Sequence, residues 1–522
     1  MDDSTLTGTL DTLTGTQGLG SVPALTILWH PDLDRAGHIA PLTALLKTHV
    51  AHVNREEPIF FPPGSSDGQS IDHRRMSHRS VIDIVFDRGS LELRRGEAGS
   101  EIEVDGRPFD EPRRITPDEL RRGIIITIAR VFVFCLHPVQ FPISRSPALG
   151  LLGTSDGIEN VRRAIIRAAD KAMPVLLRGE SGTGKELAAR ALHDSGRRAT
   201  RPFVVVNTAN LTGETAVAEL FGHQKGAFTG ADSHSLGHFR SAEGGTIFLD
   251  EVGYLEPKIQ PKLLRVLENR GVQAKGSSLE RKVDVRIIAA TDANLEQAVA
   301  TGTLEKSLYE RFNSSLNIHL PPLRERREDV GVLLVHYLRA QFDDPAHLQR
   351  LQNPDSDARP WIAARDVAAI ARSSLSGNVR TIKAVAEKLV TDAGEEPRAA
   401  HTAIVEFLAK RVLSLAEPVA PPPPPPGRPR IRRAPGDVTH DQLLAALEKA
   451  GWNRTRAAGY FEVARPTFWR WLCRHPDLRK VSDLSFEEIR RDLELCGGDV
   501  DKLARKLGVP STLVVRRLAA SR

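Results

Sequence analysis

The feature that most constrains the fold is a glycine-rich loop between an apolar strand and a helical pattern. The stretch PVLLRGESGTGKELAARALHDS has this strand–loop–helix order, which a phosphate-binding loop requires. Glycines let backbone N–H groups point at phosphate oxygens, and Lys185 can reach the outer phosphates. We predict a nucleotide site formed by Gly179, Glu180, Ser181, Gly182, Thr183, Gly184, Lys185 and Glu186. Glu186 replaces the usual Ser or Thr ligand of magnesium, so either a neighbouring group or water takes that place, or Glu186 plays a different part.

A second apolar strand, in GGTIFLDE, ends in two carboxylates. Asp250 suits Mg²⁺ coordination, usually through water, and Glu251 can polarise the attacking water. Another buried strand, VDVRIIAATD, ends at Asp292, and LSGNVR puts Arg380 in a helical end from which it could reach a nucleotide. The order of these segments predicts an ATP- and Mg²⁺-dependent α/β domain with a helical lid.

Between the two strands lies the hexapeptide GAFTGA, which phosphate chemistry does not need. A Phe-Thr pair flanked by glycines is typical of a mobile loop tip that presents an aromatic side chain to another molecule. The alternative is a surface turn whose aromatic residue packs back into the core. The residues concerned are Gly226, Ala227, Phe228, Thr229, Gly230 and Ala231.

Length and composition limit the class of protein. A chain of 522 residues predicts three or more domains, and the sequence has neither a long apolar run nor the pattern of a signal peptide. The lack of a long apolar run predicts no membrane partner. Cys135, Cys473 and Cys496 lie far apart and make neither a disulfide framework nor a zinc site, which favours a reducing cytoplasm. The net charge of +6 is compatible with nucleic-acid binding but is weak evidence for it.

Patterning predicts three segments before the C-terminal region. Residues 1–22 are expected to be disordered. Short alternating runs predict a β-sandwich over residues 23–140. Strands alternate with helical patterns over residues 149–416, with the lid over about 326–416.

The C-terminal region begins with a basic, proline-rich linker over residues 417–436, either a plain spacer or a ligand for a proline-binding domain. The all-helical segments that follow contain an internal repeat. Residues 447–472 align with residues 493–518 at a constant offset of 46 residues and share seven identical pairs. This repeat predicts two helix-turn-helix units, over residues 437–476 and 484–522.

The motifs GESGTGKE, VN, ELFGHQKGAFTGA, EGGTIFLDE, AATD, LPPLRERREDV and SGNVR resemble those of the bacterial enhancer-binding proteins, AAA+ ATPases that activate sigma-54 RNA polymerase. The resemblance covers about residues 149–416. It implies a homo-oligomeric ring with ATP between subunits, and a GAFTGA loop that contacts the sigma factor and moves with ATP turnover. It also implies that Glu186 is normal for this loop and that Asn207 holds the catalytic Glu251 in check.

Some positions depart from the family pattern. Of two arginines that act on a neighbouring subunit's nucleotide, Arg311 is present, but Glu305 replaces the first. An anionic side chain there would oppose transition-state stabilisation, and Lys306 could compensate only without a guanidinium fork. The sensor asparagine is Asp292, and the usual Trp-Pro before GNVR is Leu375-Ser376. We therefore predict slow or tightly partner-dependent hydrolysis.

Residues 23–140 look like a forkhead-associated domain, the phosphothreonine-binding β-sandwich. Arg55 stands at the place of that family's phosphate-reading arginine, Ser77 at that of its loop serine, and Asp105-Gly106 resembles its Asn-Gly turn. The usual Ser-Arg-x-His is replaced by SHRS. Because an arginine and a hydroxyl can hold a phosphate by charge-assisted hydrogen bonds, the resemblance implies recognition of a phosphothreonine protein or kinase. The alternative is a sandwich that binds no phosphate.

The first C-terminal unit resembles the Fis-type helix-turn-helix of the same activators. Residues 428–474 contain ten Lys or Arg against four Asp or Glu, which favours contact with the phosphates of double-stranded DNA. Arg465, Thr467 and Arg470 are the candidate DNA-binding residues. The alternative for either unit is a helical interaction module.

Two hypotheses of different classes follow. The first is an ATP-driven transcription activator that binds DNA upstream of promoters and remodels sigma-54 holoenzyme under control of a phospho-signal. The second is a DNA-bound regulator or scaffold that binds ATP with little productive hydrolysis, because Glu305 and Asp292 depart from the family pattern. A AAA+ remodeller unrelated to transcription would need neither GAFTGA nor a helix-turn-helix.

Overall fold

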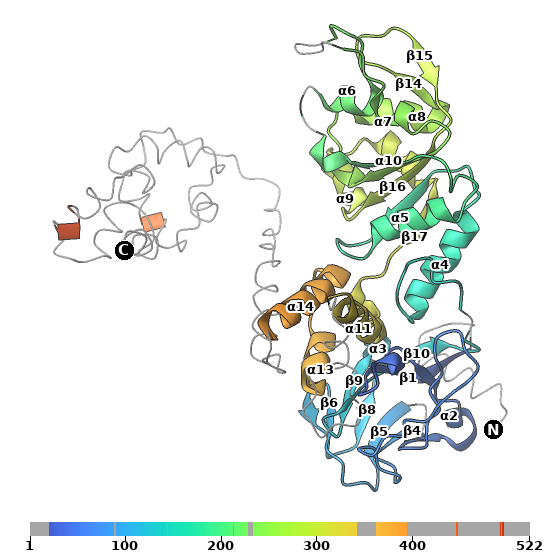
Figure 1. Cartoon of the computed structure of the whole chain (residues 1–522), viewed down its shortest axis with the longest axis vertical. Coiled ribbons are helices and arrows are strands. Elements are labelled where there is room, and N and C mark those ends of the chain that lie inside the picture. Colours follow the sequence, from blue (N-terminus) through green and yellow to red (C-terminus); the bar gives the residue numbers. More distant parts are fainter. Residues whose placement is uncertain are drawn as a thin grey trace, which may run out of the picture. The chain divides into compact units, whose positions relative to one another are not determined.

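The computed structural model describes residues 20–341, apart from 88–89, 144, 212, 214 and 228–232, as well as residues 362–393 and the positions 445–446, 491 and 493–494 (Figure 1). The chain divides into two compact units, Met1–Val419 and Ala420–Arg522. The proline-rich linker, nearly all of the N-terminal segment and of both helix-turn-helix segments, and the tip of GAFTGA lie outside the described residues. None of the described helices is long and apolar enough to cross a bilayer.

The front part of the first unit is a β-sandwich of two antiparallel sheets. The larger sheet has the order β2-β1-β10-β9-β6-β7 and the smaller β3-β4-β5-β8. This confirms the predicted β-rich front region. The elements are β1 (Ser21–Trp29), η1 (Leu33–Arg35), β2 (Ile39–Pro41), α2 (Ala44–Thr48), β3 (Val50–Val53), β4 (Ile82–Asp87), β5 (Ser90–Arg95), β6 (Ile102–Val104), β7 (Arg107–Pro108), β8 (Arg113–Ile115), α3 (Pro117–Arg122), β9 (Ile124–Ile128) and β10 (Phe132–Gln140).

The central strands of the larger sheet are buried on both faces. On β9, Ile124, Ile126 and Ile128 point into the core between the two sheets, whereas Ile125 belongs to a second hydrophobic core on the outer face. Strand β10 alternates in the same way, with Phe134 inside and Val133 outside. Because successive side chains point to opposite faces, the continuous apolar run IIITI is what two-sided burial requires.

The α/β part contains a parallel sheet of order β12-β13-β16-β11-β17 with helices on both faces. One face packs against α4 and α5, and the other packs against α6 to α10. The bounds are α4 (Asp156–Ala168), β11 (Val175–Arg178), α5 (Lys185–Asp194), β12 (Phe203–Asn207), η2 (Thr208–Asn210), α6 (Ala216–Phe221), α7 (Gly237–Ser241), β13 (Thr246–Asp250), η3 (Val252–Tyr254), α8 (Gln260–Asn269), β14 (Gly271–Gln273), β15 (Glu280–Lys282), β16 (Arg286–Thr291), α9 (Leu295–Ala300), α10 (Lys306–Asn313) and β17 (Leu316–His319).

Local sequence signals explain several of these boundaries. Ser155 begins α4 by accepting a hydrogen bond from Ile158 N, and Asn294 does the same for α9 through Gln297 N. Thr116 and Glu119 form a capping box at the start of α3, where Pro117 occupies the first turn. These caps fix where each helix starts relative to the strand before it.

The lid follows the last strand of the parallel sheet. Its elements are η4 (Leu323–Glu325), η5 (Arg327–Asp329), α11 (Val330–Ala340), α13 (Ala364–Arg372) and α14 (Asn378–Ala393). Their apolar side chains form the second hydrophobic core together with the outer face of the front sandwich. The described residues of this region are thus mainly helical, and the bounds of the predicted lid, about 326–416, stay a prediction.

Candidate functional site

The phosphate loop runs from strand β11, inside the sheet, to the first turn of α5. Gly182 and Gly184 have φ values of +78° and +105°, in the region that favours glycine. A Cβ on Gly182 would lie 2.3 Å from the carbonyl oxygen of Gly377 in the lid. The loop therefore depends on glycine both for its backbone conformation and for its contact with the lid.

Lys185 is buried at the start of α5. Its Nζ donates to Gly179 O at 2.8 Å and to Glu180 O at 3.4 Å, so the ammonium group lies within the loop. Burial raises the pKa of Asp250, and the charge of Lys185 opposes that rise. Lysine and carboxylate are thus close enough to influence each other, as a site that holds both phosphates and a cation needs.

Polar residues follow three neighbouring strands at their carboxyl ends. Asn207 ends β12 in register with Asp250, which ends β13, and Asp292 follows β16. Glu251 comes directly after Asp250 in a left-handed backbone conformation, with φ +59°. Burial first, and then the charge of Asp292, raises the pKa of Glu251 to about 7. A carboxylate with a pKa near the working pH is suited to general-base chemistry.

The acidic end of the sheet fits a magnesium ion held together with phosphates. Asp250 supplies one partly buried carboxylate, and Glu251 Oε2 is buried without a hydrogen-bond partner in the described residues. No cluster of three or more metal-ligating side chains is found in the described ranges. Mg²⁺ in nucleotide sites usually binds one or two carboxylates plus substrate oxygens, so Asp250 is the residue that would hold it, and the ion would neutralise phosphate charge.

Asn207 lies beside Asp250 at the end of the sheet, and its side chain is hydrogen-bonded within its own segment. Its Oδ1 accepts from Ala209 N at 3.0 Å and caps the short helix η2. Thr208 Oγ1 donates to Asp250 O at 2.8 Å, so the segment after β12 is bonded to the end of β13. Restraint of Glu251 by Asn207 stays a prediction from the family.

The lid binds the phosphate loop through residues that the sequence analysis did not single out. Arg324 bonds to the Glu180 carboxylate at 2.7 and 2.8 Å, and this contact lowers the pKa of Glu180. Asn378 Nδ2 donates to Ser181 O at 3.0 Å and to Glu180 Oε2 at 3.2 Å. The sequence signal that could have pointed to them is that the motifs LRER and SGNVR place charged and amide side chains after β17, the last strand of the sheet.

Two predicted arginines lie in different surroundings. Arg380 Nη1 donates to Ser181 Oγ at 3.1 Å, so the structure brings it to the phosphate loop. Arg311 on α10 donates from Nε and Nη2 to Leu267 O at 3.3 and 2.9 Å, at the end of α8. Glu305 begins α10, and its backbone N donates to Gln260 Oε1 at 2.8 Å. Within one chain, Arg311 is therefore bonded to its own subunit.

Comparisons with known proteins show the family of this chain. The family model of the sigma-54 interaction domain matches residues 151–318. The transcriptional regulatory protein ZraR of Klebsiella oxytoca is 37% identical over 342 residues, which cover 64% of this chain and 71% of ZraR. This chain belongs to the sigma-54-dependent AAA+ transcriptional activators.

Two further relatives of the activator match it over a shorter stretch or at lower sequence identity. The DNA-binding transcriptional regulator NtrC of Escherichia coli (strain K12) is 41% identical over 251 residues, 48% of this chain and 51% of NtrC. A crystal structure of NtrX from Brucella abortus in complex with ADP is 27% identical, covers 62% of this chain and 68% of NtrX, and has a TM-score of 0.42. At the level of the family, the activator regulates transcription through an ATP-dependent AAA+ domain.

The base of the activator's GAFTGA segment is anchored to two other segments. His223 and Ser235 bond to each other through both backbone pairs at 3.0 Å, which closes the two legs of the loop. Gln224 N donates to Lys275 O at 3.0 Å, on the β14–β15 hairpin. Gly226 has φ +81°, and Phe228, Thr229, Gly230 and Ala231 lie outside the described residues. Whether Phe228 is presented or packed stays a prediction.

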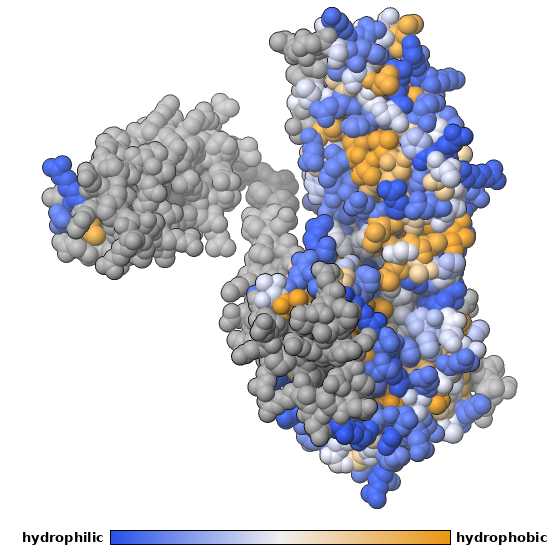
Figure 2. Space-filling view, in the orientation of Figure 1, coloured by the Kyte–Doolittle hydropathy of each residue, from blue (hydrophilic) through white to orange (hydrophobic). Residues whose placement is uncertain are grey.

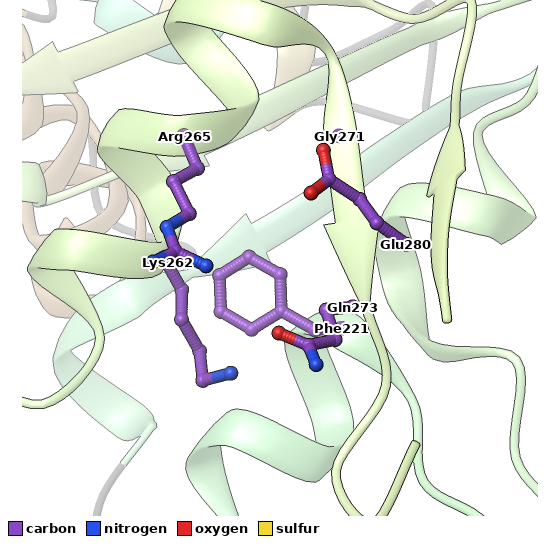
Figure 3. Close-up of a pocket in the computed structure, with 6 residues that line it drawn as sticks. All are labelled: Phe221, Lys262, Arg265, Gly271, Gln273 and Glu280. Atoms are coloured by element: carbon purple, nitrogen blue, oxygen red, sulfur yellow. The ribbon is translucent and has the colours of Figure 1, made fainter. Parts of the chain in front are cut away.

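A shallow pocket lies between α8 and the β14–β15 hairpin, near this base (Figure 3). The ring of Phe221 lies between Lys262 and Arg265 of α8 on one side and Glu280 of the hairpin on the other. Burial lowers the pKa of Lys262, and the neighbouring Arg265 adds to this effect. None of the predicted ATP-site residues lines this pocket, so it is separate from the nucleotide site.

In the front sandwich, Arg55 and Ser77 are close together. Arg55 N donates to Ser77 O at 2.8 Å, and the guanidinium donates to Asp72 Oδ1 at 2.8 and 3.0 Å. The loop after β5 joins this end of the sandwich, because Ala98 N donates to Ser80 O at 2.9 Å. That loop was missed in the sequence, where Asp105-Gly106 stood out instead.

Asp105-Gly106 lies at the other end of β6. A Cβ on Gly106 would come within 1.9 Å of Arg372 Nη1 in the lid, and the Asp105 side chain accepts from Ile125 N at 3.1 Å. This turn faces Arg372 of the lid, and it follows a strand of the larger sheet, whereas Arg55 follows a strand of the smaller one. The candidate DNA-binding residues Arg465, Thr467 and Arg470 lie outside the described residues.

Proposed function

We propose that the activator uses ATP hydrolysis at the end of its parallel sheet to drive the GAFTGA loop against sigma-54 RNA polymerase holoenzyme. The observation that carries this proposal is the position of the loop on the crossover between two paired strands. Strand β12 ends at Asn207, the chain then passes through α6, the loop and α7, and β13 ends at Asp250. Because the two strands are parallel, the crossover leaves the nucleotide edge after Asn207, and the strand that follows it returns the chain to that edge at Asp250.

The chemistry at that edge supports hydrolysis by residues of this chain. Lys185 binds the outer phosphates, Asp250 holds Mg²⁺, and Glu251 removes a proton from the attacking water. The raised pKa of Glu251 suits this transfer, because a base with a pKa of about 7 can accept and release a proton near neutral pH. Arg380 reaches the loop from the lid.

ATP bound between the subunits of a ring is part of the proposal. Exposed large apolar side chains support subunit contact, since Val205 on the edge strand β12 is 46% exposed and Tyr254 is 59% exposed. Figure 2 shows a largely hydrophilic surface with hydrophobic patches over the α/β part. In such a ring Arg311 would exchange Leu267 O for a neighbour's nucleotide.

The test is open-complex formation by sigma-54 RNA polymerase in vitro, with ATP compared with a non-hydrolysable analogue. We expect activation with ATP alone, and its loss in Phe228→Ala with ATP hydrolysis retained. Gln224→Ala, in the base of the same loop, serves as a neighbouring control. Activation with both nucleotides, or with neither, contradicts the proposal.

A second candidate is a DNA-bound regulator or scaffold with little productive turnover. The bond from Arg311 to Leu267 O, together with Glu305 at the start of α10, favours it. Measurement of steady-state hydrolysis as a function of protein concentration separates the candidates. Turnover that rises with assembly supports the first, and ATP binding without turnover at any concentration supports the second.

Control by a phosphothreonine protein is a further part of the proposal, with Arg55 and Ser77 as the phosphate-binding pair. Because Asp72 occupies the Arg55 guanidinium, a phosphate must displace that carboxylate. Fluorescence polarisation with phosphothreonine peptides should show binding to the wild type, none to Arg55→Ala, and tighter binding to Asp72→Asn. Equal binding by all three would contradict this assignment.

DNA upstream of the promoter is the proposed tether, read by the first helix-turn-helix unit. Alanine at Arg465, Thr467 or Arg470 should weaken binding of promoter fragments, with loss of selectivity where the side chain contacts a base edge. Uniform loss at every sequence would assign the residue to phosphate contact instead.

A further inference from the structure

The outer face of the larger sheet in the front sandwich is covered by the lid of the same chain. Ile125, Val133 and Cys135 of the sheet share one core with Leu334 and Val367 of the lid, and all five side chains have no exposed surface. Antiparallel sheets commonly keep one face polar and solvated. Here both faces are apolar in the sequence itself, so a cover is a requirement of this sheet.

The two parts approach each other at backbone distance. A Cβ on Gly331, in the first turn of α11, would lie 2.3 Å from Leu28 O and 2.5 Å from Leu28 Cα of β1. At the rim of the contact, Arg339 of α11 forms an ion pair with Asp34 at 2.5 Å. Helix α11 therefore lies directly on β1, and any added side chain at Gly331 must separate them.

The same lid also contacts the phosphate loop. Val379 N donates to Gly182 O at 3.0 Å, and Asn378 Nδ2 donates to Ser181 O at 3.0 Å. The buried Arg326 guanidinium donates to Thr183 O at 3.3 Å and pairs with Asp329. The lid thus lies between the front sandwich and the backbone that would hold phosphates.

We propose that the front domain sets the affinity of the activator for ATP by holding the lid in contact with the phosphate loop. When the sheet is docked on α11 and α13, Asn378 and Val379 support the loop. When the sheet is undocked, the lid loses one of its two packed sides and ATP binding weakens. Close-packed cores change between discrete arrangements rather than deforming continuously, so docking acts as a two-state element.

This inference rests on the proposed ATP site but not on the contact with sigma-54. Coupling between two sites is reciprocal, so ATP must favour docking by the same factor by which docking favours ATP. The full chain therefore offers two independent readouts. One is the Kd for ATP, and the other is the protection of residues 21–29 and 124–140 from hydrogen exchange.

The test uses Gly331→Val, with His336→Ala on the exposed side of the same helix as the control. We expect Gly331→Val to speed exchange in both segments and to raise the Kd for ATP at least about fivefold. The control should stay within about twofold of the wild type on both readouts, which is below the roughly fivefold at which allosteric couplings typically begin. Saturating ATP should slow exchange over residues 124–140 in the wild type.

A milder variant guards against unfolding of Gly331→Val. Asp34→Arg removes the ion pair with Arg339, and the double variant with Arg339→Asp restores it in reverse. The single variant should raise the Kd and the double variant should recover it. Fast exchange with an unchanged Kd, or unchanged exchange in Gly331→Val, would overturn the inference. A wild-type chain that binds no ATP would contradict the proposed function itself, which is a distinct outcome.

Discussion

The phosphate loop and helix α10 differ in their contacts within a single chain. At the loop, Lys185, Asp250 and the lid residue Asn378 are all in place around one stretch of backbone. On α10, Arg311 is bonded to Leu267 O of its own subunit. The difference shows that segments of one chain are enough to assemble the phosphate loop and its surroundings, whereas a residue that acts on a neighbouring subunit must first give up a contact within its own.

The largest expected effect concerns Glu251, which lies near the phosphate loop. Glu251→Gln should reduce ATP hydrolysis by about 100-fold or more while ATP binding remains, because the amide cannot accept a proton from water. Single-turnover hydrolysis and nucleotide binding by the purified chain measure the two quantities. Glu268→Gln, on the exposed side of α8, is the control and should behave as wild type. Equal rates in both variants would remove Glu251 from the mechanism.

The next effect concerns α10. Glu305→Arg should raise kcat about tenfold at protein concentrations that allow assembly, because it replaces an anion with a cation that can stabilise charge on the transferred phosphoryl group. Arg311→Ala should lower kcat in the same assay. If Glu305→Arg and the wild type hydrolyse ATP at equal rates, position 305 has no part in catalysis. The prediction that Glu305 slows hydrolysis is then wrong.

A smaller effect concerns the pH dependence of ATP hydrolysis, which the ionisation of Glu251 should set. The pKa of Glu251 is raised to about 7, in part by Asp292. Since the base must be ionised to act, hydrolysis should rise with pH through about 7. Asp292→Asn removes a nearby negative charge, lowers that pKa and moves the rise to lower pH. The kcat profile from about pH 6 to pH 8 measures the midpoint, and an unchanged midpoint would contradict the assignment.

The smallest effect concerns the clamp between lid and loop. The side chains of Arg324 and Glu180 are 44% and 42% exposed, so their ion pair is screened by solvent. Arg324→Ala should raise KM for ATP by no more than about threefold, with kcat nearly unchanged. A large fall in kcat would mean that Arg324 acts on the transition state and not on the ground-state loop.

The candidate nucleotide site could be predicted from the sequence because its motifs are short and contiguous. Strand, glycines and Lys185 are contiguous, and Asp250 and Glu251 end one apolar run, so backbone geometry alone brings each group to the sheet end. The central α/β sheet and the β-rich front region followed from the period of the apolar residues. These predictions needed no knowledge of which segments pack together.

The remaining features depend on distant contacts. Nothing in the segment DGR shows that Gly106 lies against Arg372. Nothing in LRER shows that Arg324 binds Glu180, 144 positions away in the sequence. The turn after β9 has positive φ at both Ala129 and Arg130, residues without a turn signature. The sequence also did not show that Asn207 Oδ1 accepts a hydrogen bond from Ala209 N, and the expected restraint of Glu251 by Asn207 stays a prediction.

The two-sided burial of β9 and β10 bears on how this chain was assembled in evolution and how it can be cut. A front domain that is apolar on its outer face cannot be exchanged for an unrelated sensor unless the lid surface changes with it. Expression of residues 149–416 alone would leave Leu334 and Val367 without the strands that cover them. Front domain and lid are therefore best treated as one inheritable block, to be kept, replaced or crystallised together.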